Sequence, residues 1–130
     1  MKITFVVPKE DDRQHPLSQY AQCKVLPPAG LARMAGLAGK HGSVKITDER
    51  IDSVQHNWQT HITVIFINSY NSYRACALAR LYRHRGSHVV FTGPKLAHPG
   101  NDTFHPERYA DSLLLGSGEE TLPALLADFV

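Results

Sequence analysis

The chain has 130 residues, a formal net charge of +2 and two cysteines, with 42% hydrophobic and 20% charged residues. This length fits a single domain with a real core, and the composition is ordinary for a globular protein. The mild charge argues against a nucleic-acid-binding protein, no apolar run reaches the roughly 18 residues of a membrane span, and two distant cysteines give no disulfide framework.

The first third of the chain predicts a strand, a long loop, a helix and a second strand. Residues 2–7 are apolar and β-branched and are followed by Pro8, so they indicate a first strand rather than a signal peptide. We therefore expect a cytoplasmic protein. Polar residues and prolines at 9–27 indicate a long loop, the apolar spacing at 28–40 predicts a helix, and residues 43–46 form a short strand.

The rest of the chain alternates in the same way. Residues 47–59 form a polar connection with room for one helical turn or two, and 61–67 are almost continuously apolar, as in a central parallel strand. Asn68, Ser69, Asn71 and Ser72 offer capping oxygens for the helix that follows. The remaining predicted elements are a helix at 72–85, a strand at 88–91, a loop at 92–109 with a short helical turn after Pro106, a strand at 113–115 and a helix at 119–129.

Strands that alternate with helices predict an α/β domain with a parallel sheet. Five strands joined by right-handed crossovers favour the order 2-1-3-4-5 in three layers, which is the flavodoxin-like or Rossmann-like arrangement. We expect residues 1–130 to form this one domain. The loops at 8–27, 68–72, 92–104 and 116–119 then share the carboxyl edge of the sheet, and ligands of open α/β sheets bind at that edge.

Five segments resemble one family, in order and spacing. They are LPPAGLARMAGLAGKHG at 26–42, VKITD at 44–48, the strand, polar loop and helix at 61–86, VVFTGPK at 89–95, and FHPERYADSLLLGSGEETLPALLADF at 104–129. They resemble the cobalamin (B12)-binding domain found at the N-terminus of many radical S-adenosylmethionine enzymes. The chain departs from that family at Thr92, Lys95 and Ser117, and it lacks the CxxxCxxC motif that would hold an iron–sulfur cluster.

The resemblance implies a module that binds cobalamin and positions it for a radical S-adenosylmethionine domain, in the same longer chain or in a separate subunit. The module would not be catalytic by itself, and methyl transfer or related chemistry would belong to the partner. Gly93, Gly116 and Gly118 would give bare backbone at the ligand, Ser69, Ser72, Thr92 and Ser117 would give hydroxyls, and Tyr70 or Asn71 would cover the lower face of cobalt. The predicted cofactor-binding residues are Ser69, Tyr70, Asn71, Ser72, Thr92, Gly93, Pro94, Gly116, Ser117, Gly118 and Glu119.

Other interpretations stay open beside this one. The glycines could simply make tight turns, and the domain could keep the fold without a cofactor as a regulatory or interaction module. A flavin or nucleotide module is also compatible with such an edge. His15 does not match the histidine motif of related mutase-type domains, and the other histidines lack metal-ligand spacing. Cys76 falls within a predicted helix, where we expect it to pack, and Cys23 lies in a loop with no evident base nearby. We therefore expect no protein ligand to a metal and no catalytic residue.

Overall fold

The structure is a computed structural model, and it describes residues 1–10, 29–51, 53–97, 105–116 and 118–129. The elements, in chain order, are β1 (Lys2–Val7), α2 (Ala29–Ala38), β2 (Ser43–Asp48), β3 (Ile62–Phe66), α3 (Ser72–His84), β4 (His88–Thr92), α4 (Pro94–Ala97), the 3-10 turn η1 (Pro106–Arg108), β5 (Ser112–Leu114) and α5 (Thr121–Asp128). Within these ranges no helix has the length and apolarity needed to cross a membrane.

The five strands form one all-parallel sheet in the order β2-β1-β3-β4-β5, which confirms the predicted flavodoxin-like α/β fold. β1 lies between β2 and β3, with Phe5 opposite Ile46 on one side and Val64 on the other. The chain moves outward from β1 to β2, returns to β3, and then moves outward in the other direction to β4 and β5. The direction therefore reverses between β1 and β3, where open α/β sheets bind their ligands.

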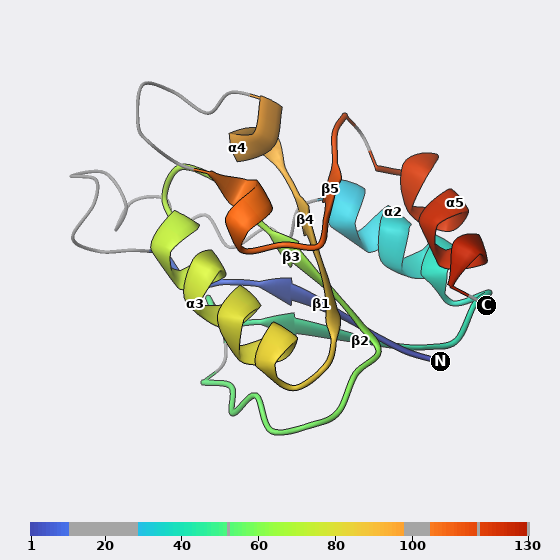
Figure 1. Cartoon of the computed structure of the whole chain (residues 1–130), viewed down its shortest axis with the longest axis horizontal. Helices are drawn as coiled ribbons and strands as arrows, with labels where there is room; N and C mark the ends of the chain where they lie inside the picture. Colours follow the sequence, from blue (N-terminus) through green and yellow to red (C-terminus); the bar gives the residue numbers. More distant parts are fainter. Residues whose placement is uncertain (11–28, 52, 98–104, 117, 130) are drawn as a thin grey trace.

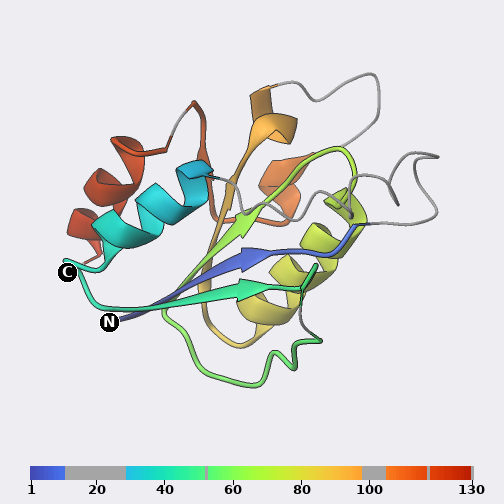
Figure 2. The same ribbon diagram turned by 180° about the vertical axis from the view of Figure 1, so that it is seen from behind.

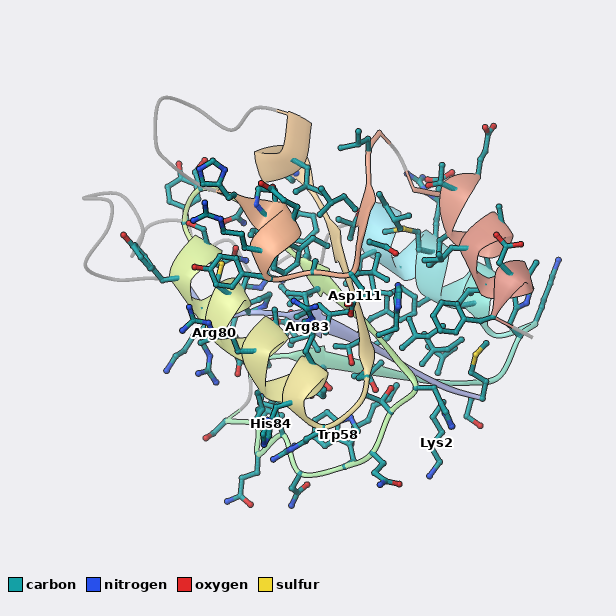
Figure 3. The ribbon with its side chains drawn as sticks, in the orientation of Figure 1. Lys2, Trp58, Arg80, Arg83, His84 and Asp111 are labelled. Carbon is teal, nitrogen blue, oxygen red and sulfur yellow. The ribbon has the colours of Figure 1, made fainter. Side chains whose placement is uncertain are left out.

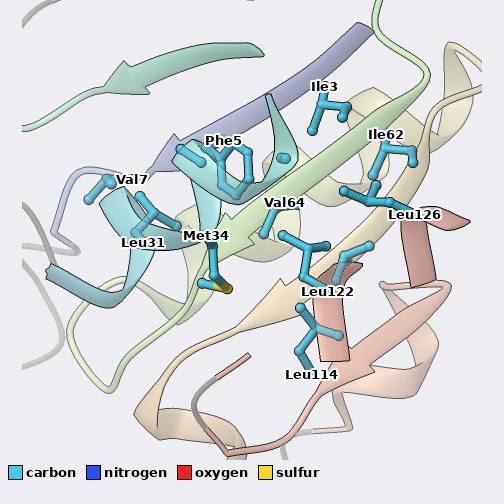
Figure 4. Packing of buried hydrophobic residues seen from close by; sticks show 13 residues of the cluster. Ile3, Phe5, Val7, Leu31, Met34, Ile62, Val64, Leu114, Leu122 and Leu126 are labelled. Carbon is cyan, nitrogen blue, oxygen red and sulfur yellow. The ribbon is translucent and has the colours of Figure 1, made fainter. Parts of the chain in front are cut away.

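Helices cover both faces of the sheet, as Figures 1 and 2 show: α2 and α5 lie together on one face, and α3 lies on the other. Successive side chains of a strand point to opposite faces, and the buried residues follow this alternation. Ile3, Phe5 and Val7 of β1 pack under α2 and α5 with Met34 and Leu122 (Figure 4). Val6 belongs to the second core, which packs against α3. The apolar strands therefore supply two separate cores, and the sheet is buried on both sides at its centre.

The connection from β2 to β3 differs from a standard crossover. Its described residues, 49–51 and 53–61, contain no helix, so the one or two helical turns for which the segment has room are not formed there. In its place Trp58 packs on the sheet beside α3 (Figure 3), its Nε1 donating to Thr4 Oγ1 at 3.2 Å and the ammonium of Lys45 lying 3.6 Å from its ring centre. The indole covers the apolar surface that a crossover helix would have covered.

Smaller differences concern the ends of the elements. β2 runs two residues further than predicted, to Asp48, because it keeps pairing with β1 as far as Val7. The four-residue helix α4 was not predicted, whereas the turn after Pro106 is confirmed as η1. The last helix begins at Thr121 rather than at residue 119, because Gly118 to Glu120 form a turn first.

Candidate functional site at the carboxyl edge of the sheet

The loops that follow β3, β4 and β5 lie next to one another, because these strands are neighbours in the sheet and all end at the same edge. In Figure 1 this edge can be found from α4, the short helix that directly follows the carboxyl end of β4. The structure places Ser69, Tyr70, Asn71, Ser72, Thr92, Gly93, Pro94, Gly116, Gly118 and Glu119 in these loops or at their ends. Ser117 and most of the long first loop, residues 11–28, lie outside the described residues.

Two asparagines fix the loop after β3. Oδ1 of Asn68 accepts from the backbone N of Tyr70 at 2.8 Å and of Asn71 at 3.1 Å. The side chain of Asn71 makes two hydrogen bonds of its own. Its Oδ1 accepts from Asn68 N at 2.9 Å, and its Nδ2 donates to Phe66 O at 3.1 Å. Asn71 is the N-cap residue of α3 but makes no side-chain capping bond, so the predicted cap is wrong there: its amide is used within the loop.

The consequence for the predicted cofactor contacts is that Asn71 is buried, with only 1% of its surface exposed, and cannot reach a large ligand. Ser69 is exposed, and Tyr70 and Ser72 are half-buried. The loop is therefore held in one shape by its own side chains, while its tip faces outward. A loop that is ordered before a ligand arrives loses little conformational entropy on binding.

Two of the three predicted glycines are explained by close packing of the chain against itself. Gly93 has φ +128°, and a Cβ added there would lie 2.4 Å from the carbonyl oxygen of Ile67. Gly118 has φ +75°, and its Cβ would lie 2.6 Å from Met34 Sδ. These contacts agree with the alternative interpretation that glycine makes tight turns, and they require no ligand.

Gly116 differs, because its φ of +80° is combined with open space around the position of a Cβ. Thr92 is only 3% exposed, so its hydroxyl lies inside the edge rather than on it. Pro94 begins α4 and is exposed, and Glu119 forms an ion pair with Arg33 at 2.6 Å. The outward-facing part of the predicted set is therefore Ser69, Pro94 and Gly116, with Tyr70, Ser72, Gly93 and Glu119 partly exposed.

A buried carboxylate at the same edge was missed by the sequence analysis. Glu49 follows β2 directly, and its side chain is only 5% exposed. Its Oε1 accepts from Lys9 N at 3.1 Å and from Arg74 Nε at 3.0 Å, while Oε2 accepts from a terminal guanidinium nitrogen of Arg74 at 2.7 Å and lies 2.7 Å from His56 Nε2. We call Glu49, His56, Arg74 and Tyr82 the Glu49 cluster.

Opposing effects act on the charge of Glu49. Burial by itself raises the pKa of this carboxyl group, but the hydrogen bonds from His56, Arg74 and the Lys9 amide outweigh it and lower the pKa to about 2. Because an ionised carboxylate only accepts, His56 Nε2 donates to it, and in neutral His56 Nδ1 then accepts from the Tyr82 hydroxyl at 2.6 Å. Burial raises the pKa of that hydroxyl well above its usual range, so Tyr82 stays a donor.

A pocket of about 330 Å³ opens beside this cluster, at the carboxyl ends of β1 and β2. Its lining residues are Lys9, Glu49, Ile51, Ser53, Val54 and Arg74. Four of these residues lie within the segment 49–54, whereas Lys9 comes from the end of β1 and Arg74 from the first turn of α3, and no short sequence spacing links these two to the segment. Only Glu49, an acid directly after a strand at the carboxyl edge, carried a signal that sequence reasoning could have used.

The remaining predictions on reactive residues concern histidines and cysteines. The described residues include no group of three His, Cys, Asp or Glu side chains placed to hold a metal ion. Cys76 is half-buried and packs into the core beneath α3. At the end of α3, Arg83 pairs with Asp111 at 3.1 Å (Figure 3) and Arg85 donates to the carbonyl oxygen of His56, so these cations serve local contacts.

The candidate site is thus a carboxyl edge with an ordered loop after β3, an open glycine after β5, and a polar pocket after β1 and β2. These features are compatible with binding of a ligand at this edge. The sequence matches no family model and no curated protein.

Proposed function

We propose that the chain is a cobalamin-binding module of a cytoplasmic protein, with its ligand lying over the carboxyl ends of β3, β4 and β5. One observation carries the proposal: the described residues of the loops at 68–72, 92–94 and 116–119 come together at the ends of three adjacent parallel strands, beside the point where the chain direction reverses. The five segments that resemble the B12-binding domains of radical S-adenosylmethionine enzymes contain these same loops. Fold and resemblance therefore support the same edge.

The residues at the edge fit a broad, flat ligand in two respects. Gly116 presents backbone with no atom near the position of a Cβ, and Ser69 and Tyr70 lie on a loop whose shape is fixed by Asn68 and Asn71. Gly116 backbone, the Ser69 hydroxyl and the Tyr70 ring would hold the cofactor. When bound, cobalamin supplies a cobalt centre that can carry a methyl group, and the chain's own part is to hold the corrin and present one face to a radical S-adenosylmethionine domain.

A second candidate function is a domain that keeps this fold without a cofactor and acts in regulation or protein interaction. It is favoured by the burial of Thr92 and by the packing contacts that explain Gly93 and Gly118 without a ligand. The two candidates differ in one measurable property, the retention of cobalamin by the purified chain.

The test is to mix the purified chain with hydroxocobalamin, remove free cofactor by desalting, and record the visible spectrum. We expect the protein fraction to keep about one equivalent of corrinoid, with the absorption bands of bound hydroxocobalamin. An equally treated sample of heat-unfolded chain is the control for nonspecific carry-over. A colourless protein fraction would reject the cobalamin module and support the cofactor-free domain.

A further inference from the structure

The two outermost strands of the sheet differ in how well they are protected from pairing with another chain. Proteins usually prevent such pairing with short edge strands, proline, bulges or charged side chains. β5 follows this rule, because it has only three residues. β2, the outermost strand beside β1 (Figure 2), has six residues and no proline, and it pairs with β1 without a bulge from Ser43 to Asp48. β2 is therefore the edge strand that can accept a further strand.

The one lysine of β2 is not placed to block this edge. Its ammonium group lies 3.6 Å from the ring centre of Trp58, which packs in the core on the α3 side of the sheet. Ile46 points to the opposite side, because it lies beside Phe5, and Phe5 belongs to the core under α2 and α5. Ile46 is nevertheless 55% exposed. An exposed apolar side chain therefore lies in the middle of the edge strand.

The backbone groups of β2 point alternately toward β1 and away from it. At the start of the strand, Ser43 N donates to Met1 O at 2.9 Å. Just after its end, Glu49 N donates to Val7 O at 2.9 Å, so the odd-numbered residues face β1. The residues whose N–H and C=O groups face away are Val44, Ile46 and Asp48. Since β2 ends the strand order, no strand of the described chain pairs with these groups.

We propose that a second copy of this chain pairs its β2 antiparallel to the first, with a two-fold axis at Ile46, and so joins two five-stranded sheets into one. The outward backbone groups then meet: Ile46 exchanges two hydrogen bonds with the second copy's Ile46, and Val44 pairs with Asp48. The charges also fit, since Lys45 lies opposite Thr47 and no like charges face each other. An axis at Lys45 would instead place two ammonium groups opposite each other.

This match of the edge with itself favours a second copy over a strand from another protein. The interface is separate from the loops after β3, β4 and β5, so it goes beyond the cobalamin proposal and does not depend on it. One pair of strands with an apolar contact at its centre makes a small interface, so we expect a dimer that dissociates on dilution.

The test is sedimentation velocity of the cofactor-free, full chain over a series from about 10 μM to about 1 mM, in which we expect the dimer fraction to rise with concentration. Ile46→Lys should raise the dissociation constant of the dimer by about tenfold or more, because it places two like charges opposite each other at the axis. Ile51→Lys is the matched control. Ile51 is 59% exposed but lies in the turn after β2, so this substitution should leave the dissociation constant unchanged.

Charge complementation tests the register. Ile46→Glu alone should also weaken the dimer, whereas an equimolar mixture of Ile46→Lys and Ile46→Glu chains should associate again, because opposite charges then meet at the axis. A wild-type chain that stays monomeric over the whole series would overturn the proposal and leave this edge to a strand from another protein. Equal weakening by Ile46→Lys and Ile51→Lys, or no association in the mixture, would overturn it as well. Since no cobalamin is present, the result is independent of whether the chain retains the cofactor.

Discussion

Gly93→Ala is expected to destabilise the protein by about 3 kcal/mol, more than any other glycine substitution at the carboxyl edge. Its φ of +128° is unfavourable for alanine, and the new methyl group would lie 2.4 Å from Ile67 O. That carbonyl belongs to the backbone where β3 ends, and Ile67 N donates to Thr92 O at 2.8 Å. The backbone of Ile67 therefore cannot move away from the new methyl group without losing this hydrogen bond between the ends of β3 and β4. Urea unfolding followed by the fluorescence of Trp58, the single tryptophan, measures the loss.

Gly116→Ala is the matched control for this substitution. It has a similar left-handed backbone, with φ +80°, but open space around the added methyl group. Its cost should therefore be only the conformational part, about 1 kcal/mol. Equal losses in the free energy of unfolding for Gly93→Ala and Gly116→Ala would show that the close approach of Ile67 O does not add to the cost of a side chain at Gly93. A substitution of Gly93 is also unsuitable as a probe of ligand binding, since it disturbs the fold first.

Glu49→Ala is the second substitution with a large expected effect, a loss of about 3 kcal/mol in the free energy of unfolding. It removes the acceptor of four hydrogen bonds and leaves Arg74 and His56 without their carboxylate partner. It also loosens the contact between the β2–β3 connection and α3, which passes through His56 and Tyr82. The same urea unfolding experiment measures it.

Glu119→Ala is the control, because it removes a carboxylate from an ion pair that is open to water. The side chains of Arg33 and Glu119 are 66% and 35% exposed, so the loss should stay below about 1 kcal/mol. Similar losses for Glu49→Ala and Glu119→Ala would contradict the role given to the buried cluster.

Glu49 also makes stability depend on pH in a defined direction. Its pKa is about 2 in the folded protein, against 4.5 for an unperturbed glutamate, so the unfolded chain binds the proton first as pH falls. The stabilisation is therefore fully present above pH 4.5 and is lost as pH falls from 4.5 toward 2. Glu49→Gln, which cannot titrate, should show a smaller loss over this range than the wild type when urea midpoints are compared.

The fold could be predicted because its signals are local. Each strand is a short apolar run, and the two long crossover helices carry an apolar face, so element order alone led to the sheet order β2-β1-β3-β4-β5. The segment 47–59 was harder, because its structure depends on Trp58 reaching Thr4 and Lys45 across the sheet. A polar segment without helical periodicity does not reveal where one aromatic side chain will pack.

The sequence predicts which loops share the carboxyl edge of the sheet, but not what the individual residues of these loops contact. Parallel topology puts the loops after β3, β4 and β5 at one edge, and the structure has them there. Whether a glycine faces a ligand or another part of the chain depends on distant residues, such as Ile67 for Gly93 and Met34 for Gly118. The Glu49 cluster could not be predicted for the same reason, since its members lie up to 33 positions apart, from 49 to 82.

The central claim is that a corrinoid lies over the carboxyl ends of β3, β4 and β5, and two bulky substitutions test it most directly. Ser69→Trp places an indole on the exposed tip of the loop after β3, whereas Gln59→Trp places the same group on the exposed connection that leads to the opposite end of β3. In the hydroxocobalamin retention assay we predict that Ser69→Trp loses most of the bound corrinoid and that Gln59→Trp keeps as much as the wild type. Equal retention by the two folded variants would contradict this placement of the ligand.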